Sequence, residues 1–268
     1  MGRAEMNTGE QLTIEQAIAN LAGDDLGLRL YSAWWLGRFR VREERAIQAL
    51  VQALQDEDDR TPNGGYPLRR NAARALGKVG DGRVVPHLME CLYCEDFYVR
   101  EAAAQALEML KDPACVPSLL QLLAEPESVP HPAPELPYLA QPFDAIIEAL
   151  GTLGAKEAVG LISSYLEHEV PRIRFAAARA LYQLTTDRER YGEILIAGLR
   201  SPDLQLRRAV LADIGAIGYL GAAQPVADTL AENSLKLLAL KGILEQNLPP
   251  DYLTADTIGV MNLMDSLL

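Results

Sequence analysis

L-R-R-N-A-A-R-A-L-G-K-V-G, residues 68–80, is one copy of a pattern that recurs along most of the chain. Apolar or small residues stand at its central leucine, Leu76, and three, four and eight positions before it, which places them on one face of a helix. Successive copies are separated by 40, 31, 43, 31, 33 and 29 residues, a period of about 34 that is typical of stacked helical hairpins. The copies align on the central residues Leu36, Leu76, Leu107, Leu150, Leu181, Ile214 and Ile243.

A further helix is predicted upstream of most copies, in segments that are apolar and often carry a proline near their start, where the missing amide costs least. Two helices per unit at this period predict an all-α fold, a HEAT-like or armadillo-type α-solenoid of about six to seven helical-hairpin repeats. We predict one α-solenoid domain over residues 1–268, ended by a capping helix within Thr254 to Leu268. The upstream helices are expected at Glu44 to Leu54, Val84 to Leu92, Val116 to Leu123, Ala158 to Tyr165, Gly192 to Leu199 and Ala222 to Leu230.

Two repeats are longer than the others because each contains an insertion. Residues 56–67 form a long polar turn, and residues 125–142 are rich in proline, which predicts an extended, stiff segment. Insertions in a solenoid fall on one face, often the face that binds a partner or ligand. Function is therefore expected near these departures from the repeat.

Composition narrows the class of protein. The net charge of −12 argues against nucleic acid as the main partner, since that affinity comes chiefly from phosphate neutralisation. No stretch has the 18 or so apolar residues that a membrane span needs, and the first ten residues do not resemble a secretory signal. Three cysteines fit a reducing compartment, so we expect a cytoplasmic protein.

A basic residue stands seven positions before six of the seven central residues. One interpretation is a line of cations for binding. The favoured interpretation is a structural ladder, in which each cation pairs with carboxylates across the stack. In three copies an aspartate precedes the arginine by four residues and fits a helix N-cap, namely Asp25, Asp96 and Asp203. Arg69 and Arg174 lack this aspartate and are predicted to be less constrained than the others, which are Arg29, Arg100, Arg207 and Lys236.

Both tryptophans of the chain stand at positions where the repeat has no need of bulk. Trp35 replaces the alanine, glycine or aspartate of the other copies, and Trp34 takes a position that is mostly polar elsewhere. Tyr31 would lie on the same helical face as Trp34. An exposed aromatic patch usually marks a binding surface. The alternative is that the first twenty residues cover these rings as a cap.

The turn at residues 56–67 brings acids, glycines and arginines together. The arginines after it could bind a carboxylate or phosphate at the start of a helix, or they could neutralise the acids of the turn, and the two roles are compatible. The candidate residues are Glu57, Asp58, Asp59, Arg60, Gly64, Gly65, Tyr66, Arg69, Arg70 and Arg74.

Other chemistry has little support in the sequence. His87, Cys91 and Cys94 could share a helical face, but a structural zinc site normally has a second well-spaced pair, so we predict no metal and inert, buried thiols. No nucleophile–base signature, phosphate-binding loop or dinucleotide motif is recognisable. An enzyme with this sequence would work by positioning its substrate and by handling protons.

Two stretches carry a resemblance to a known family: Y-S-A-W-W-L-G at residues 31–37, and E-D-D-R-T-P followed by G-G-Y-P-L-R-R-N, which together span residues 57–71. With them, the chain resembles the E/F-type phycobilin lyases, which are HEAT-like repeat proteins, and among them the E-type subunits. The repeat likeness extends over nearly the whole chain but is generic. The two stretches are more specific, because helix stacking requires neither of them.

The resemblance implies a heterodimer with an F-type subunit. It also implies attachment of an open-chain tetrapyrrole, phycocyanobilin, to a cysteine of a phycobiliprotein α subunit through a thioether. The bilin would be a substrate, with no cofactor bound permanently. On this basis Glu57, Asp58 and Asp59 are candidates for accepting pyrrole N–H groups. The expected bilin-binding residues are Tyr31, Trp34, Trp35, Arg60, Gly64, Gly65, Tyr66, Arg69, Arg70 and Arg74. The alternative function is a non-catalytic HEAT-like adaptor that binds phycobiliproteins during phycobilisome assembly or degradation.

Overall fold

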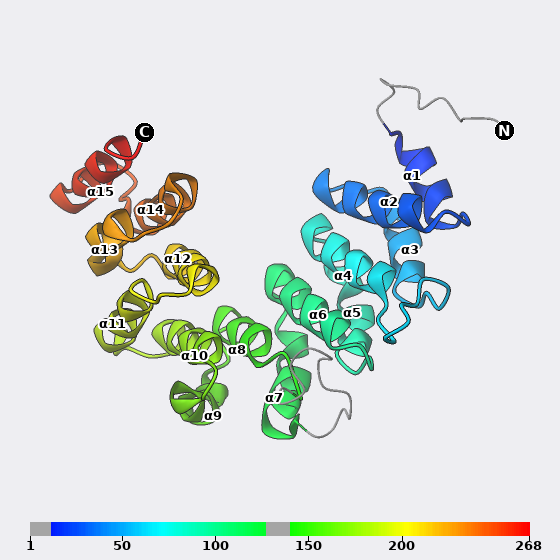
Figure 1. Ribbon diagram of the computed structural model, residues 1–268, viewed down its shortest axis with the longest axis horizontal. Coiled ribbons are helices and arrows are strands. Elements are labelled where there is room, and N and C mark those ends of the chain that lie inside the picture. The colour runs from blue at the N-terminus through cyan, green and yellow to red at the C-terminus, as the bar shows by residue number, and fades with distance from the viewer. Residues whose placement is uncertain (1–11, 127–139) are drawn as a thin grey trace. The chain divides into compact units, whose positions relative to one another are not determined.

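The computed structural model describes residues 12–126 and 140–268, and within them the regular secondary structure is helical throughout (Figure 1). The α-helices are α1 (Ile14–Leu21), α2 (Leu26–Arg38), α3 (Glu44–Ala53), α4 (Pro67–Val79), α5 (Val85–Cys91), α6 (Phe97–Leu110), α7 (Val116–Ala124), α8 (Phe143–Thr152), α9 (Val159–Ser164), α10 (Pro171–Leu184), α11 (Arg188–Gly198), α12 (Leu204–Ile217), α13 (Ala223–Asp228), α14 (Asn233–Asn247) and α15 (Ala255–Asp265). None of these helices is long and apolar enough to cross a bilayer.

The chain divides into two compact units, Met1–Ser118 with Pro126–Pro142, and Leu119–Glu125 with Phe143–Leu268. In unit 1, α2, α4 and α6 pack side by side, and α3 and α5 pack against α4 and α6 (Figure 1). In unit 2, α8, α10, α12 and α14 pack in sequence, with α11 and α13 against their neighbours and α15 against α13 and α14. The predicted all-α solenoid of helical hairpins is confirmed. A single domain over the whole chain stays a prediction.

The second helix of each repeat supplies most of the core. The central residue and the residues three and four positions before it are buried in every copy, as the helical spacing predicts. The position eight before the centre is less uniform: Leu68 is fully buried, whereas Leu28 is 45% exposed. Close approach of neighbours depends on glycine: a Cβ on Gly37 would lie 2.6 Å from the Ala75 Cα.

The upstream helices lie close to where they were predicted. α11 differs most, because it begins at Arg188, four residues before the predicted Gly192. The predicted C-terminal cap is α15, whose N-cap Thr254 accepts a hydrogen bond from the Thr257 amide. Most of the proline-rich insertion at 125–142 lies outside the described residues.

The predicted N-caps are confirmed, since the carboxylates of Asp25, Asp96 and Asp203 each accept amide hydrogen bonds at the start of their helices. The basic ladder is structural, but its partners are mostly main-chain carbonyls and not the predicted carboxylates, because carbonyls at helix ends and turns otherwise lack donors. The bonds run from Arg100 to Cys94 O (2.8 Å), Arg174 to His168 O (2.8 Å), Arg207 to Ser201 O (2.5 Å) and Lys236 to Ala227 O (2.9 Å).

Candidate functional site

The inserted turn at residues 56–67 is held against its surroundings by its own hydrogen bonds and by buried charges. Thr61 and Gly65 close it: the Thr61 amide donates to Gly65 O at 2.9 Å, and the Gly65 amide donates to Thr61 Oγ1 at 2.8 Å. Gly64 adopts a φ of 84°, a left-handed conformation that glycine accepts without strain. The two glycines therefore shape the turn, and the structure gives them no direct role at an open surface.

Tyr66 lies inside this arrangement, where it is 3% exposed. Its hydroxyl donates to Glu95 at 2.6 Å, which together with burial raises the pKa of Tyr66 to about 12. Its ring lies under two guanidinium groups, those of Arg60 at 4.9 Å and Arg69 at 3.9 Å from the ring centroid. Tyr66 thus packs the turn and does not form a wall of an open pocket.

The arginines of the turn neutralise nearby groups. Arg60 pairs with Glu95 at 2.6 Å. Arg69 pairs with Glu57 and donates to the main-chain oxygen of Asp56 at 2.7 Å. The prediction that Arg69 and Arg174 are less constrained is therefore wrong, since each is engaged as firmly as the ladder members that follow an aspartate.

The three carboxylates predicted to meet pyrrole N–H groups have different environments. Glu57 is occupied by Arg69. Asp59 is buried, its Oδ2 has no hydrogen-bond partner, and burial together with the nearby Asp56 raises its pKa. Asp58 has a side chain that is 86% exposed and a contact of 3.8 Å to Arg29. Of these three acids, Asp58 is the most exposed; the Glu57 side chain is 66% exposed but is paired with Arg69.

The aromatic residues of α2 form an open surface. Tyr31 is 49% exposed and Trp34 is 47% exposed, and their ring centroids lie 5.5 Å apart. Trp35 is half-buried against Phe39, at 4.9 Å between ring centroids. All four rings line a groove of about 780 Å³, together with Leu12, Ile14, Val41, Arg42 and Glu43. Within the described residues the predicted aromatic patch is thus exposed, and residues 1–11 of the proposed cap lie outside them.

Arg70 and Arg74 of α4 stand apart from the other arginines. Within the described part of the chain, the Arg70 side chain has no ion pair or hydrogen bond, and its guanidinium carbon lies 5.9 Å from the centroid of the Tyr98 ring. Arg74 is partly exposed and lies 3.7 Å from Glu101, a long and solvated pair. Within the described residues, neither guanidinium makes a close ion pair that would stabilise the fold.

Four candidate residues lie on two adjacent helices and outside the hydrogen bonds of the turn, namely Tyr31 and Trp34 on α2 and Arg70 and Arg74 on α4, and we call them the exposed ridge. The two helices are in direct contact, since Asn71, next to Arg70, donates to the oxygen of Leu30, next to Tyr31, at 3.5 Å. Arg70 is half-buried and the other three are exposed, and the two arginines reach Tyr98 and Glu101 of α6. Trp35 lies at the edge of the ridge. The other candidates have contacts within the turn or to Glu95, although the side chains of Glu57 and Arg60 are 66% and 48% exposed; these candidates are Glu57, Asp59, Arg60, Gly64, Gly65, Tyr66 and Arg69.

Sequence reasoning missed Glu95, which organises the turn, and counted Asp56 only among the acids of the turn that the arginines would neutralise. Glu95 binds both Arg60 and the Tyr66 hydroxyl, and Asp56 binds Arg29. A signal was present for Asp56, because it begins the run of acids at 56–59. Glu95 could not be identified, since it lies one repeat away and nothing in its neighbourhood departs from the pattern.

The thiols are unsuited to attack on a substrate. Burial raises the pKa of Cys91 to about 12 and that of Cys115 to about 11, and it raises the pKa of Cys94 as well. A search of the described residues finds no group of three histidine, cysteine or acidic side chains placed to hold a metal ion.

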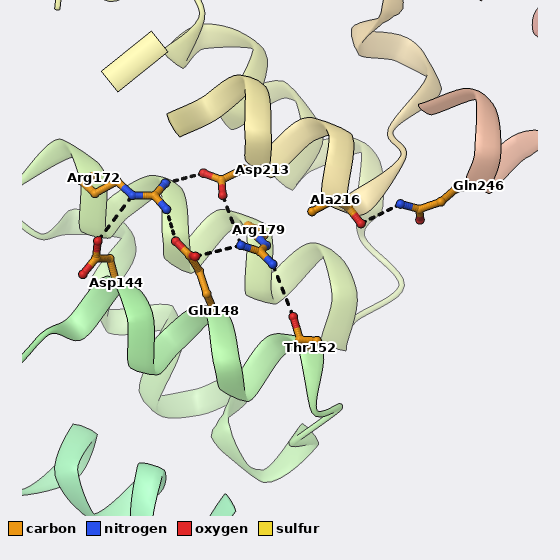
Figure 2. Close-up of polar contacts among 8 residues, drawn as sticks. All are labelled: Asp144, Glu148, Thr152, Arg172, Arg179, Asp213, Ala216 and Gln246. Atoms are coloured by element: carbon orange, nitrogen blue, oxygen red, sulfur yellow. Dashed lines mark hydrogen bonds and ion pairs between the residues drawn. The ribbon is translucent and has the colours of Figure 1, made fainter. Parts of the chain in front are cut away.

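In unit 2, arginines on the corresponding helices are paired with carboxylates of neighbouring helices, as Figure 2 shows. There, α8, α10 and α12 are joined by a network of buried charges. Arg172 pairs with Asp144 at 3.5 Å, with Glu148 and with Asp213, while Arg179 pairs with Glu148 at 2.8 Å. Both guanidinium groups are thus occupied by carboxylates from neighbouring helices. Among the described residues, the arginines of the exposed ridge in unit 1 have no such carboxylate partner apart from the long contact of Arg74 with Glu101.

Glu148 makes the stability of unit 2 depend on pH. Burial, followed by repulsion from Asp213, raises its pKa to about 8. The folded state then keeps a proton that the unfolded state loses, so the free energy of unfolding falls as the pH rises from about 4.5 to about 8. Glu148→Gln removes this titration and is expected to flatten that dependence, measured as urea midpoints across the window. Glu157→Gln, at an exposed carboxylate of the same unit, should leave the slope unchanged. Equal slopes in wild-type protein and Glu148→Gln would contradict this account.

Comparison with known proteins bears on the family. Residues 14–92, 64–130 and 144–213 match the model for HEAT repeats. Phycocyanobilin lyase subunit alpha from Microchaete diplosiphon is 62% identical, with 99% of this chain and 92% of the relative covered. Bilin biosynthesis protein PecE from Mastigocladus laminosus is 43% identical, with 90% and 84% covered. A chain of the solved complex of CpcE and CpcF of phycocyanin lyase from Nostoc sp. PCC7120 superposes with a TM-score of 0.86 at 53% identity, covering 100% of this chain and 99% of that one. The chain belongs to the family of phycocyanobilin lyase α subunits, which are built from HEAT repeats.

Proposed function

We propose that this chain is the E-type subunit of a phycobilin lyase that binds phycocyanobilin and catalyses its attachment to a cysteine of a phycobiliprotein α subunit. The observation that carries the proposal is the 62% identity to a phycocyanobilin lyase α subunit over essentially the whole chain. An F-type subunit is the partner, as the superposition on a chain of the CpcE–CpcF complex supports. The enzyme acts in the cytoplasm of a cyanobacterium, and the bilin is its substrate.

The reaction is an addition and needs no oxidant. The sulfur of the acceptor cysteine bonds to the exocyclic ethylidene carbon of ring A, the ethylidene double bond is consumed, and the thiol proton ends on the tetrapyrrole. The nucleophile belongs to the acceptor protein. This agrees with the raised pKa values of the three cysteines here, which keep their thiols protonated. The task of the lyase is to hold bilin and acceptor in a reactive orientation.

The exposed ridge suits such a ligand. A bilin has a flat conjugated face and two propionates. The face can stack on Tyr31 and Trp34, and each propionate can take a charge-assisted pair from Arg70 or Arg74. The groove beside Trp35 gives room for the rest of an elongated ligand. We retain Asp58 as the carboxylate that accepts pyrrole N–H groups, because Glu57 is paired and Asp59 is buried.

Co-expression tests the function directly. The chain is produced with an F-type subunit, a phycobiliprotein α subunit and a source of phycocyanobilin. We expect covalent bilin on the acceptor, seen as zinc-enhanced fluorescence of the denatured polypeptide, and none when either lyase subunit is omitted. Co-purification of the chain with the acceptor but without covalent colour would favour the adaptor alternative and contradict the proposal.

A further inference from the structure

Arg29 and Arg69 pair with carboxylates of the inserted turn. Arg100, Arg174 and Arg207 donate to carbonyls five or six residues earlier in their own repeats, and Arg100 and Arg207 also reach forward to the carbonyls of Ala140 and Leu230. Arg29 reaches forward across 27 residues and pairs with Asp56, at the start of the inserted turn. It also donates from Nε to Leu21 O at 3.1 Å. Arg29 therefore joins α1 and α2 to the turn.

Asp56 connects three parts of unit 1. One carboxylate oxygen binds Arg29, and the other accepts the amide hydrogen of Asp59 at 2.9 Å. Its main-chain oxygen accepts from Arg69 of α4 at 2.7 Å. Both members of the Arg29–Asp56 pair are buried, with side chains 10% and 4% exposed. A buried pair of this kind holds its two elements in one geometry, because separating the charges leaves each without a partner.

The elements joined in this way are the two that carry the exposed ridge. Tyr31 and Trp34 lie on α2, within two turns of Arg29, and Arg70 follows Arg69 directly on α4. A shift of the turn or of α2 would change the separation between the aromatic rings and the guanidinium groups. A rigid flat ligand with fixed propionates is sensitive to that separation.

We propose that Arg29 and Asp56 are positioning residues for the bilin, fixing the distance between the aromatic half and the arginine half of the exposed ridge. This role rests on the proposed function, since it concerns the same ligand and the same surface. Neither residue touches the bilin. Arg29 also lies 3.8 Å from the carboxylate of Asp58, the acid that we assign to the pyrrole N–H groups.

Conservative substitutions are used so that a loss of bilin transfer does not simply reflect unfolding of the variant. Asp56→Asn keeps the shape and one acceptor but removes the charge, and Arg29→Lys keeps the charge but removes the fork that reaches both Asp56 and Leu21. The matched control is Arg174→Lys, at the same repeat position in unit 2, where the partners are the carbonyls of His168 and Glu169. Each variant is prepared as a complex with the F-type subunit, and helicity is compared by circular dichroism.

We expect Asp56→Asn and Arg29→Lys to slow bilin transfer roughly 10- to 100-fold and to shift the absorption band of the bound bilin, while Arg174→Lys changes neither. Amide hydrogen exchange should quicken at residues 56–66 in the first two variants only. Wild-type transfer and absorption in Asp56→Asn and Arg29→Lys would overturn the positioning role while leaving the proposed function standing. A wild-type complex that takes up no bilin would overturn both, and the exchange data would then report only on how the turn is held.

Discussion

Replacing Arg70 and Arg74 together by alanine is expected to lower bilin transfer about 100-fold or more without loss of helix content. Each arginine can make a charge-assisted pair with a propionate, and such hydrogen bonds contribute about 1.5–3 kcal/mol each. Because Arg74 is partly exposed, we place the summed contribution of the two pairs at the lower end of this range, about 3 kcal/mol. A loss of about 3 kcal/mol corresponds to a roughly 100-fold decrease in bilin transfer. The stability of the fold should change little. Within the described residues the Arg70 side chain makes no ion pair, and the ion pair between Arg74 and Glu101 is long.

The matched control for this double variant is Arg45→Ala, at an exposed arginine of α3 whose contacts to Glu15 and Glu43 are 3.6 and 3.7 Å long. It removes one surface charge from the same unit and should leave transfer unchanged. Arg70→Lys separates charge from geometry, because lysine keeps the cation but cannot bind a carboxylate in two places. Transfer at the wild-type rate by the Arg70→Ala, Arg74→Ala protein would exclude these residues as the propionate clamp.

The fold followed from the sequence because it depends on a repeated local pattern. The buried positions three and four before each central residue need only helical spacing to be recognised, and each repeat confirms the others. Leu28 shows where this reasoning fails. It is apolar, like its equivalents Leu68 and Val99, yet it is 45% exposed, so an apolar residue at this position does not by itself establish burial.

The contacts of the candidate residues could be predicted only in part, because arginine and carboxylate side chains do not reveal their partners in a sequence. Arg69 and Arg70 are adjacent and equally basic, but their helical positions differ by one residue. Arg69 therefore points to the turn and binds Glu57, whereas Arg70 lies toward Tyr98. Trp34 was a clearer signal than the charged residues, because a bulky ring at an outward position of the helix has no role in packing the repeats together.

Replacing Trp34 by alanine is expected to weaken bilin binding by roughly 10- to 100-fold, the second large effect at the exposed ridge. Stacking of a flat ring on an aromatic side chain contributes about 1–3 kcal/mol. Trp34 is half exposed and contacts Tyr31, so its removal leaves no cavity in the core and the fold should be retained. Trp34→Phe keeps an aromatic face and should retain part of the affinity. Binding is measured by titrating phycocyanobilin into the complex and following its absorption band.

Leu238→Ala is the matched control for Trp34→Ala, since Leu238 is an exposed apolar residue of α14 in unit 2, 63% exposed, and the exposed ridge lies in unit 1. If only the loss of exposed apolar surface mattered, both variants would bind the bilin equally weakly. If the bilin stacks on Trp34, only Trp34→Ala should lose affinity for the bilin. Co-purification with the F-type subunit tests a third possibility, that Trp34 contacts the partner subunit. If Trp34→Ala loses its partner while the isolated chain still binds bilin as before, the aromatic face is a subunit contact, and the ridge serves the bilin through Arg70 and Arg74 alone.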